Sequence, residues 1–126
     1  MKPRPLSRLH AGVKQRVSLR CSCENLETVY IHLDDQGNLR ANDDHKTFQY
    51  LYEANDSTYG PLEALDLDLI RETFDELQVE WVDAPADGYP GIECRIGPEQ
   101  PIADAVERVA EAIERVFFIA RRPDLK

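Results

Sequence analysis

The sequence has few of the residues that familiar catalytic motifs require. Only 6 of its 126 residues are glycine, and none of them forms a glycine-rich phosphate loop. No Ser/His/Asp or Cys/His arrangement carries a local signature of nucleophilic catalysis. Nucleotide hydrolysis and acyl transfer therefore have no support, and we predict a protein that is not an enzyme and needs no cofactor.

Long apolar runs and an even set of cysteines are also missing. The apolar runs extend over a few residues, far short of the roughly 20 that cross a bilayer, and the first residues lack the apolar core of a signal peptide. The three cysteines, Cys21, Cys23 and Cys94, are odd in number, so we expect reduced thiols rather than disulfides. These absences predict a cytoplasmic protein with no membrane partner.

Acidic residues are absent from the first twenty positions and dominate the rest of the chain. Between Cys21 and Glu114 there are 23 acids and five bases, a net charge of −18. The start contributes +6 and the segment from Arg115 to Lys126 contributes +3, which gives the formal net charge of −9. We therefore divide the chain into a basic arm or lead-in helix, residues 1–15, and a single acidic domain, residues 16–126. The bases of the start are Lys2, Arg4, Arg8, Lys14, Arg16 and Arg20.

Hydrophobic periodicity predicts five strands and three helices. Alternating apolar residues predict strands at about 17–23, 28–33, 39–41, 79–82 and 92–96, the first three forming a meander and the last two a second pair. Apolar residues three and four apart predict helices at about 45–53, 67–77 and 102–120. The order β-β-β-α-α-β-β-α predicts an α+β fold, an antiparallel sheet covered on one face by helices, with a long C-terminal helix.

Side-chain chemistry suggests how these helices begin and pack. Asp43 or Asp44 can cap the first helix and Asp66 or Asp68 the second, because a carboxylate accepts the free N–H groups of a first turn. In the first helix, Phe48, Leu51 and Tyr52 are expected to face the core, as is Trp81 in the fourth strand. The last helix carries a regular apolar stripe and two predicted ion pairs, Asp104 with Arg108 and Glu111 with Arg115. The stripe comprises Ile102, Val106, Val109, Ile113, Val116 and Ala120.

Several of these stretches resemble a bacterial and phage family called domain of unknown function eighteen-twenty-eight. The resemblance covers roughly Val17 to Ala120 and lies in the run Thr28–Leu33, the strand ending Leu39–Asp44, the Ile70–Val82 segment and the closing helix around Val106. It implies a fold and a prokaryotic or phage origin, but no activity. The architecture is also similar to that of small acidic secretion chaperones, which implies an acidic protein that holds another protein.

Two metal-dependent sites are possible from the residue types alone. Cys21, Cys23 and Cys94, with His32 or His45, could offer zinc ligands, although all three cysteines occupy the apolar phase of predicted strands. Asp83 followed by Glu93 and Arg95 resembles the acidic hairpin of a metal-dependent nuclease, in which two carboxylates hold Mg²⁺ and a cation assists. The alternative interpretation is an ordinary amphipathic strand. Asp44 and His45 could separately carry a role at the end of the third strand.

The basic arm admits three interpretations. It can be a solubilising lead, a strap across the acidic domain, or a contact with nucleic acid, which would make the protein a DNA-contacting regulator. The acidic domain in turn favours a basic protein partner.

The far end of the last helix is apolar on nearly all sides. There Phe118 lies on the side shared with Glu107, Glu111 and Glu114, opposite the apolar stripe, and Arg121 and Arg122 follow it. One interpretation is that the basic arm packs over this helix end. The other, which we favour, is a homodimer through this helix. Glu107, Glu111 and Glu114 are the candidate contacts to the basic partner. We expect a non-enzymatic acidic binding module with an anti-defence, immunity or chaperone-like adaptor role.

Overall fold

The computed structural model describes residues 14–20, 26–33, 37–53, 56–61, 64–86 and 88–121 of the chain. For residues 14–20 and 26–28 it describes the backbone alone. The five strands are β1 (Lys14–Arg20), β2 (Leu26–Leu33), β3 (Leu39–Asn42), β4 (Glu80–Val82) and β5 (Gly91–Ile96). The three helices are α1 (Lys46–Glu53), α2 (Leu67–Leu77) and α3 (Ile102–Ala120).

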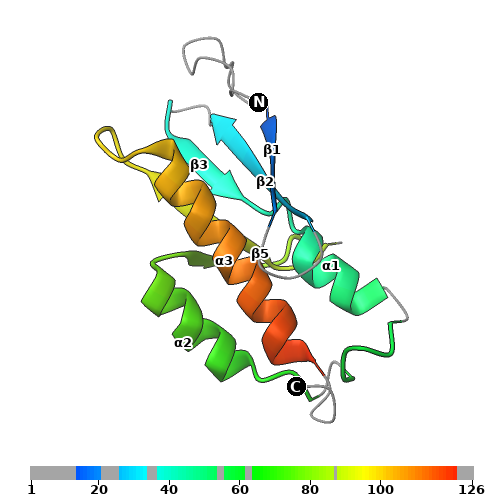
Figure 1. The fold of residues 1–126 in the computed structure, drawn as a ribbon. Helices are drawn as coiled ribbons and strands as arrows, with labels where there is room; N and C mark the ends of the chain where they lie inside the picture. Colours follow the sequence, from blue (N-terminus) through cyan, green and yellow to red (C-terminus); the bar gives the residue numbers. More distant parts are fainter. Residues whose placement is uncertain are drawn as a thin grey trace.

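The strands form one sheet in the order β1-β2-β3-β5-β4, and every neighbouring pair is antiparallel (Figure 1). The predicted α+β class, the meander and the second strand pair are confirmed. β5 pairs with β3, which joins the meander and the second strand pair into one continuous sheet, with Ala41 opposite Cys94. β1 begins at Lys14, three residues before the predicted start at Val17.

One face of the sheet forms the floor of the core. Ile31, Ala41 and Cys94 lie side by side on β2, β3 and β5, and all three are buried. Side chains alternate between the faces of a strand, so His32 and Arg40 lie on the opposite face. The three helices cover the apolar face: α3 runs between α1 and α2 and contacts β2, β3 and β5 (Figure 1).

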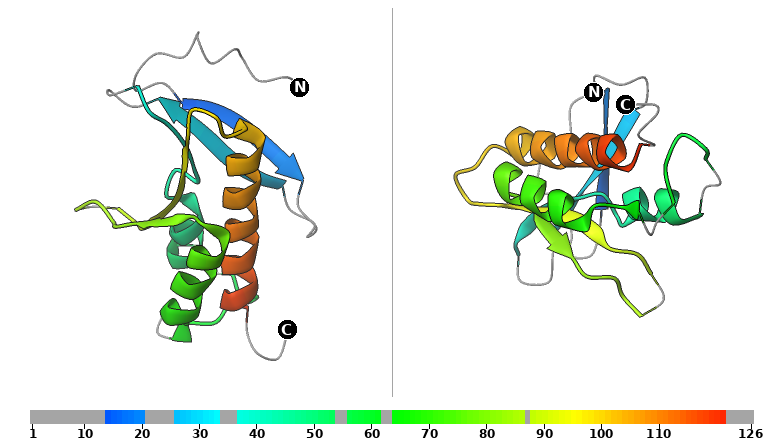
Figure 2. Two further views of the ribbon diagram at one scale, coloured as in Figure 1. Left: turned by 90° about the vertical axis from the view of Figure 1, so that its left-hand side faces the viewer. Right: turned by 90° about the horizontal axis from the view of Figure 1, so that it is seen from below.

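The stripe predicted for α3 is buried from Val106 to Ala120, while Ile102 is partly exposed. Ala105, Ala110 and Ala112 are buried as well, which widens the apolar face and lets α2 pack alongside α3 (Figure 2). Both predicted ion pairs are present, at 3.0 Å between Arg108 Nε and Asp104 Oδ2 and 3.3 Å between Arg115 and Glu111.

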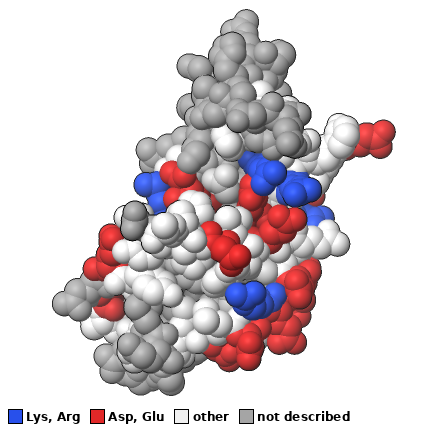
Figure 3. Space-filling view, turned by 180° about the vertical axis from the view of Figure 1, so that it is seen from behind, with Lys and Arg blue, Asp and Glu red and all other residues white. Residues whose placement is uncertain are grey.

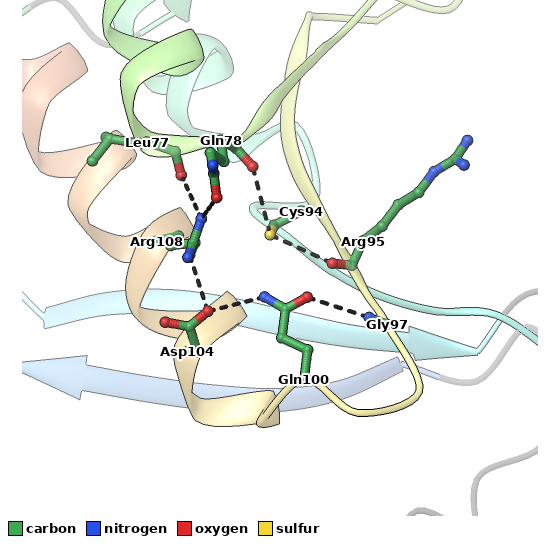
Figure 4. A network of polar contacts seen from close by, with 8 residues as sticks. All are labelled: Leu77, Gln78, Cys94, Arg95, Gly97, Gln100, Asp104 and Arg108. Atoms are coloured by element: carbon green, nitrogen blue, oxygen red, sulfur yellow. Dashed lines mark hydrogen bonds and ion pairs between the residues drawn. The ribbon is translucent and has the colours of Figure 1, made fainter.

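A polar network fastens the beginning of α3 to the end of α2 and to β5 (Figure 4). The Arg108 guanidinium donates to Asp104, to the carbonyl of Leu77 and to the side chain of Gln78. Gln78 ends α2 in the left-handed backbone conformation, with φ of 60°. Its carbonyl accepts a hydrogen bond from the Cys94 thiol at 3.8 Å. Gln78, at the end of α2, therefore contacts both β5 and α3.

Trp81 of β4 joins α1 and α2. Its ring lies 5.1 Å from that of Phe48 and 6.1 Å from that of Phe74, and the Arg71 guanidinium covers it at 4.6 Å. The predicted packing of Trp81 against the core is confirmed, although the residue keeps part of its surface exposed. Among the described helices, none is long and apolar enough to span a membrane.

Candidate functional site

The turn between β3 and α1 is organised by a buried carboxylate. Asp43 is 1% exposed and accepts hydrogen bonds from the backbone N–H groups of His45, Thr47 and Ile92. Of the two predicted caps of α1, Asp43 is therefore the residue that accepts from the first turn of the helix. Its bond to Ile92, at 3.0 Å, also ties this turn to β5. In α2, Asp66 performs the capping role, accepting from Leu69 N at 3.0 Å.

His45 occupies a strained and closely packed position beside this carboxylate. Asp44 and His45 both adopt the left-handed conformation, with φ of 55° and 59°, which costs a non-glycine residue of order 1 kcal/mol. The His45 ring nitrogen Nδ1 lies 2.7 Å from the carbonyl of Tyr89, and because a carbonyl can only accept, Nδ1 carries the proton. The ring rests on Gly91, where a Cβ would lie 2.8 Å from Nδ1.

A pocket of about 230 Å³ opens at this turn. Its carboxylates already have structural partners: Asp43 binds three backbone groups, and Glu93 is buried and paired with Arg40 at 3.2 Å. In the part of the chain that the structure describes, no three His, Cys, Asp or Glu residues are grouped so as to hold a metal ion. The pocket is lined by His32, Asn42, Asp43, Asp44, His45, Val82, Gly91, Ile92 and Glu93.

The residues of the nuclease-like alternative are spread over the β4–β5 hairpin. Glu93 lies opposite Glu80 in the sheet, and exposed Asp83 follows the end of β4 in the alternate side-chain phase. Arg95 lies 3.9 Å from Glu80, and the ion-pair partner of Glu93 is Arg40. The structure therefore does not bring Asp83, Glu93 and Arg95 together around one point.

The zinc alternative cannot be assembled from the described residues. Cys21 and Cys23 lie outside them. Cys94 is a buried free thiol that donates to the carbonyls of Gln78 and Arg95, and burial raises the pKa of this thiol. His32 lies on the face of the sheet opposite Cys94 and lines the pocket.

Two groups of aromatic rings flank α1. On one side the Tyr50 ring lies 6.2 Å from Tyr59 and 5.7 Å from Phe117, and on the other the Tyr52 ring lies 5.4 Å from Tyr89. Tyr50 and Tyr52 are 44% and 43% exposed, so the prediction that Tyr52 faces the core is wrong. An eight-residue helix packed along one side offers only part of its surface to the core, and here Thr47 and Phe48 are buried and Leu51 packs against the core as predicted. We call the rings on the two sides of α1 the aromatic surface: Tyr50, Tyr52, Tyr59, Tyr89 and Phe117.

Carboxylates stand at the edge of each aromatic group. Tyr50 donates its hydroxyl hydrogen to Asp56 at 2.7 Å, and Tyr89 donates to Glu53 at 2.6 Å. These hydrogen bonds lower the pKa values of both carboxyl groups and raise those of both tyrosines. Sequence analysis missed this arrangement, because the ring contacts join residues up to 67 positions apart, Tyr50 and Phe117.

The exposed side of α2 is strongly acidic. Arg71 is the one base of this helix, and its guanidinium lies over Trp81. In Figure 3, which views the molecule from behind, Asp and Glu crowd the side that α2 occupies. We call the exposed carboxylates of this helix and its cap the α2 acidic face: Asp66, Asp68, Glu72, Asp75 and Glu76.

The residues proposed on α3 are mostly at the surface. Glu107 and Glu111 are exposed and Glu114 is half-buried. Phe118 is 56% exposed, more than any other large hydrophobic residue among those described, and Arg121 is also exposed. Arg122 and the basic arm up to residue 13 lie outside the described residues. Next to Arg121, the segment 56–61 is held against the end of α3 by a bridge between Tyr59 and Arg121.

A scan against known protein families, a search of curated proteins and a search of solved structures gave no match to this chain. The resemblance described above stays a prediction. A function for this protein must therefore be inferred from the geometry and charge of its own residues.

Proposed function

We propose that the protein is a non-enzymatic binding module that engages a basic protein partner. The α2 acidic face is the observation that carries this proposal. It places five exposed carboxylates on one helix and its cap, while the one base of that helix lies against Trp81. Charges of one sign gathered on one face attract a partner of the opposite sign and repel unsuitable ones.

The rest of the acidic domain supports the same interpretation. Glu107 and Glu111 add exposed carboxylates on α3, and the charge of the domain between Cys21 and Glu114 is −18. Such a surface repels nucleic-acid phosphates, so a basic protein is the natural complement. The buried carboxylates Asp43 and Glu93, by contrast, hold the fold together through backbone N–H groups and Arg40.

The cellular setting of this proposal is the cytoplasm of a prokaryote or the cell that a phage infects. A reducing compartment suits the buried free thiol of Cys94 and the odd number of cysteines. An anti-defence, immunity or chaperone-like role would each use such an acidic surface to engage a basic partner.

The proposal is tested by affinity capture of the tagged protein from its native host, after nuclease digestion, followed by mass spectrometry. We expect a basic protein to be retained by the wild type and released by added salt. The double variant Glu72→Lys/Glu76→Lys should lose it. Asp83→Lys/Glu99→Lys, which changes the net charge equally at exposed sites off the helix, should keep it. Recovery of nucleic acid alone, or of no basic protein, would overturn the proposal.

A further inference from the structure

The exposed side of α1 differs in character from the α2 acidic face. Its tyrosines Tyr50 and Tyr52 leave nearly half of their surface in water, although each ring is held in place by another aromatic ring. Tyr59 and Phe117 support the first, and Tyr89 supports the second. Rings that are fixed by packing and still exposed can contact a partner with little further loss of side-chain entropy.

Negative charge is concentrated where α1 ends. The last turn of α1, which is described in full, has no basic residue, so no side chain of that turn offsets the partial negative charge of the helix end. Glu53 lies in that turn and Asp56 shortly after it. Tyr89 and Tyr50 donate to these carboxylates and lower their pKa values, and carboxyl groups of this kind are ionised at neutral pH. Each carboxylate retains lone pairs for a further donor.

We propose that the aromatic surface, together with Glu53 and Asp56, is the docking site for a basic segment of the partner, whose Lys or Arg side chains lie on the tyrosine rings and end at these carboxylates. This inference rests on the proposed function, since it names the part of the molecule that anchors the basic partner. Aromatic faces attract cations through their quadrupole, and carboxylates pair with them directly.

Charge complementarity selects a basic segment over other occupants. An apolar peptide would cover the ionised Glu53 and Asp56 without offering them a donor, which costs free energy. A second copy related by a two-fold axis through this surface would place Glu53 and Asp56 of both copies in one interface, and the aromatic surface contributes no base to pair with them. A basic segment satisfies the rings and the carboxylates at once.

The α2 acidic face and the aromatic surface then contribute to different steps of binding. The α2 acidic face acts at a distance and sets how fast the partner arrives, whereas the aromatic surface makes the short-range contacts that keep it bound. Removing charge from α2 should therefore slow association, and removing rings from α1 should speed dissociation.

A labelled peptide of twelve alternating arginine and serine residues provides the test, with its dissociation constant measured by fluorescence anisotropy at fixed salt. Tyr50→Ser/Tyr52→Ser removes both exposed rings, and Glu53→Gln removes one charge while keeping the shape of the side chain. We expect each to weaken binding by about threefold or more, the size expected for exposed cation–aromatic and ion-pair contacts. Leu67→Ser/Leu69→Ser removes two leucines that are each 43% exposed on α2, and it should bind as the wild type does.

Thermal melts keep the result interpretable. Tyr52→Phe retains the ring and should bind the peptide as the wild type does. If Tyr50→Ser/Tyr52→Ser melts at a lower temperature than the wild type, its weaker binding is judged against the dissociation constants of Tyr52→Phe and Glu53→Gln. Binding unchanged in both Tyr50→Ser/Tyr52→Ser and Glu53→Gln, or no binding of the peptide to the wild type, would overturn this docking site. The proposed function would still be judged separately by capture of a basic protein and its loss in Glu72→Lys/Glu76→Lys.

Discussion

The hydroxyl of Tyr89 donates a hydrogen bond to Oε1 of Glu53 over 2.6 Å, and so joins the β4–β5 connection to the end of α1. The two residues are 36 positions apart in the chain. Gln49 donates to the other oxygen of the same carboxylate at 3.3 Å, which fixes its orientation. A carboxylate held in this way is presented to solvent in one defined position beside Tyr89, whose ring lies 5.4 Å from that of Tyr52.

Replacement of Tyr89 by Phe should raise the pKa of Glu53. The hydroxyl is the main reason that this pKa lies below the ordinary value of 4.5, so removing it returns the carboxyl group toward that value. A lowered pKa in the folded state stabilises the protein above pH 4.5, and that stabilisation is lost as the pH falls through the lowered value. Carboxyl-detected NMR titration of wild type and Tyr89→Phe measures this directly, and equal pKa values in the two proteins would contradict the hydrogen bond.

Substitution of Gly91 by Ala should destabilise the fold by about 1–3 kcal/mol, the usual cost of forcing a side chain into occupied space. The new Cβ would lie 2.8 Å from Nδ1 of His45, so the imidazole must leave the Tyr89 carbonyl. Urea denaturation of Gly91→Ala, of His45→Ala and of the double variant tests this relationship. The double variant should be less destabilised than the sum of the two single variants, because the clash needs both side chains. Simple additivity would show that the two positions are independent.

Phe118→Asp tests the predicted homodimer. Phe118 is 56% exposed on α3, and an apolar ring in that position favours association with a second copy. We expect light scattering to give twice the mass of the chain for the wild type and the mass of one chain for the variant. The monomeric variant should still fold and unfold cooperatively, because Phe118 lies outside the buried stripe of α3. A wild type that remains monomeric at high concentration would contradict the dimer.

Features of this fold that arise between residues close in the sequence could be predicted, and those that join distant segments could not. The stripe of α3 and the ion pair of Asp104 with Arg108 arise within one helix, so spacing alone identified them. The contact between β3 and β5 joins segments about fifty residues apart, and periodicity carries no information about such pairings. The bond from Ile92 N to Asp43 belongs to the same class.

The surfaces were harder to predict than the core. Sequence analysis anticipated an acidic domain and an exposed Phe118, which depend on composition and helical phase. It placed Tyr52 in the core, because tyrosine at helical spacing from Phe48 has the same pattern whether it packs inside or stands at the surface. The role of Tyr89 depends on a loop whose path no local pattern specifies.

The central claim is that the α2 acidic face attracts a basic partner, and the association rate constant tests it most directly. The measurement uses the basic protein retained in the capture experiment and compares wild type, Glu72→Lys/Glu76→Lys and Asp83→Lys/Glu99→Lys at two salt concentrations. We predict that reversing the α2 charges slows association by about tenfold or more and weakens its salt dependence, as expected when steering charges are reversed. The matched control should associate as the wild type does, and equal rate constants for the two double variants would contradict the claim.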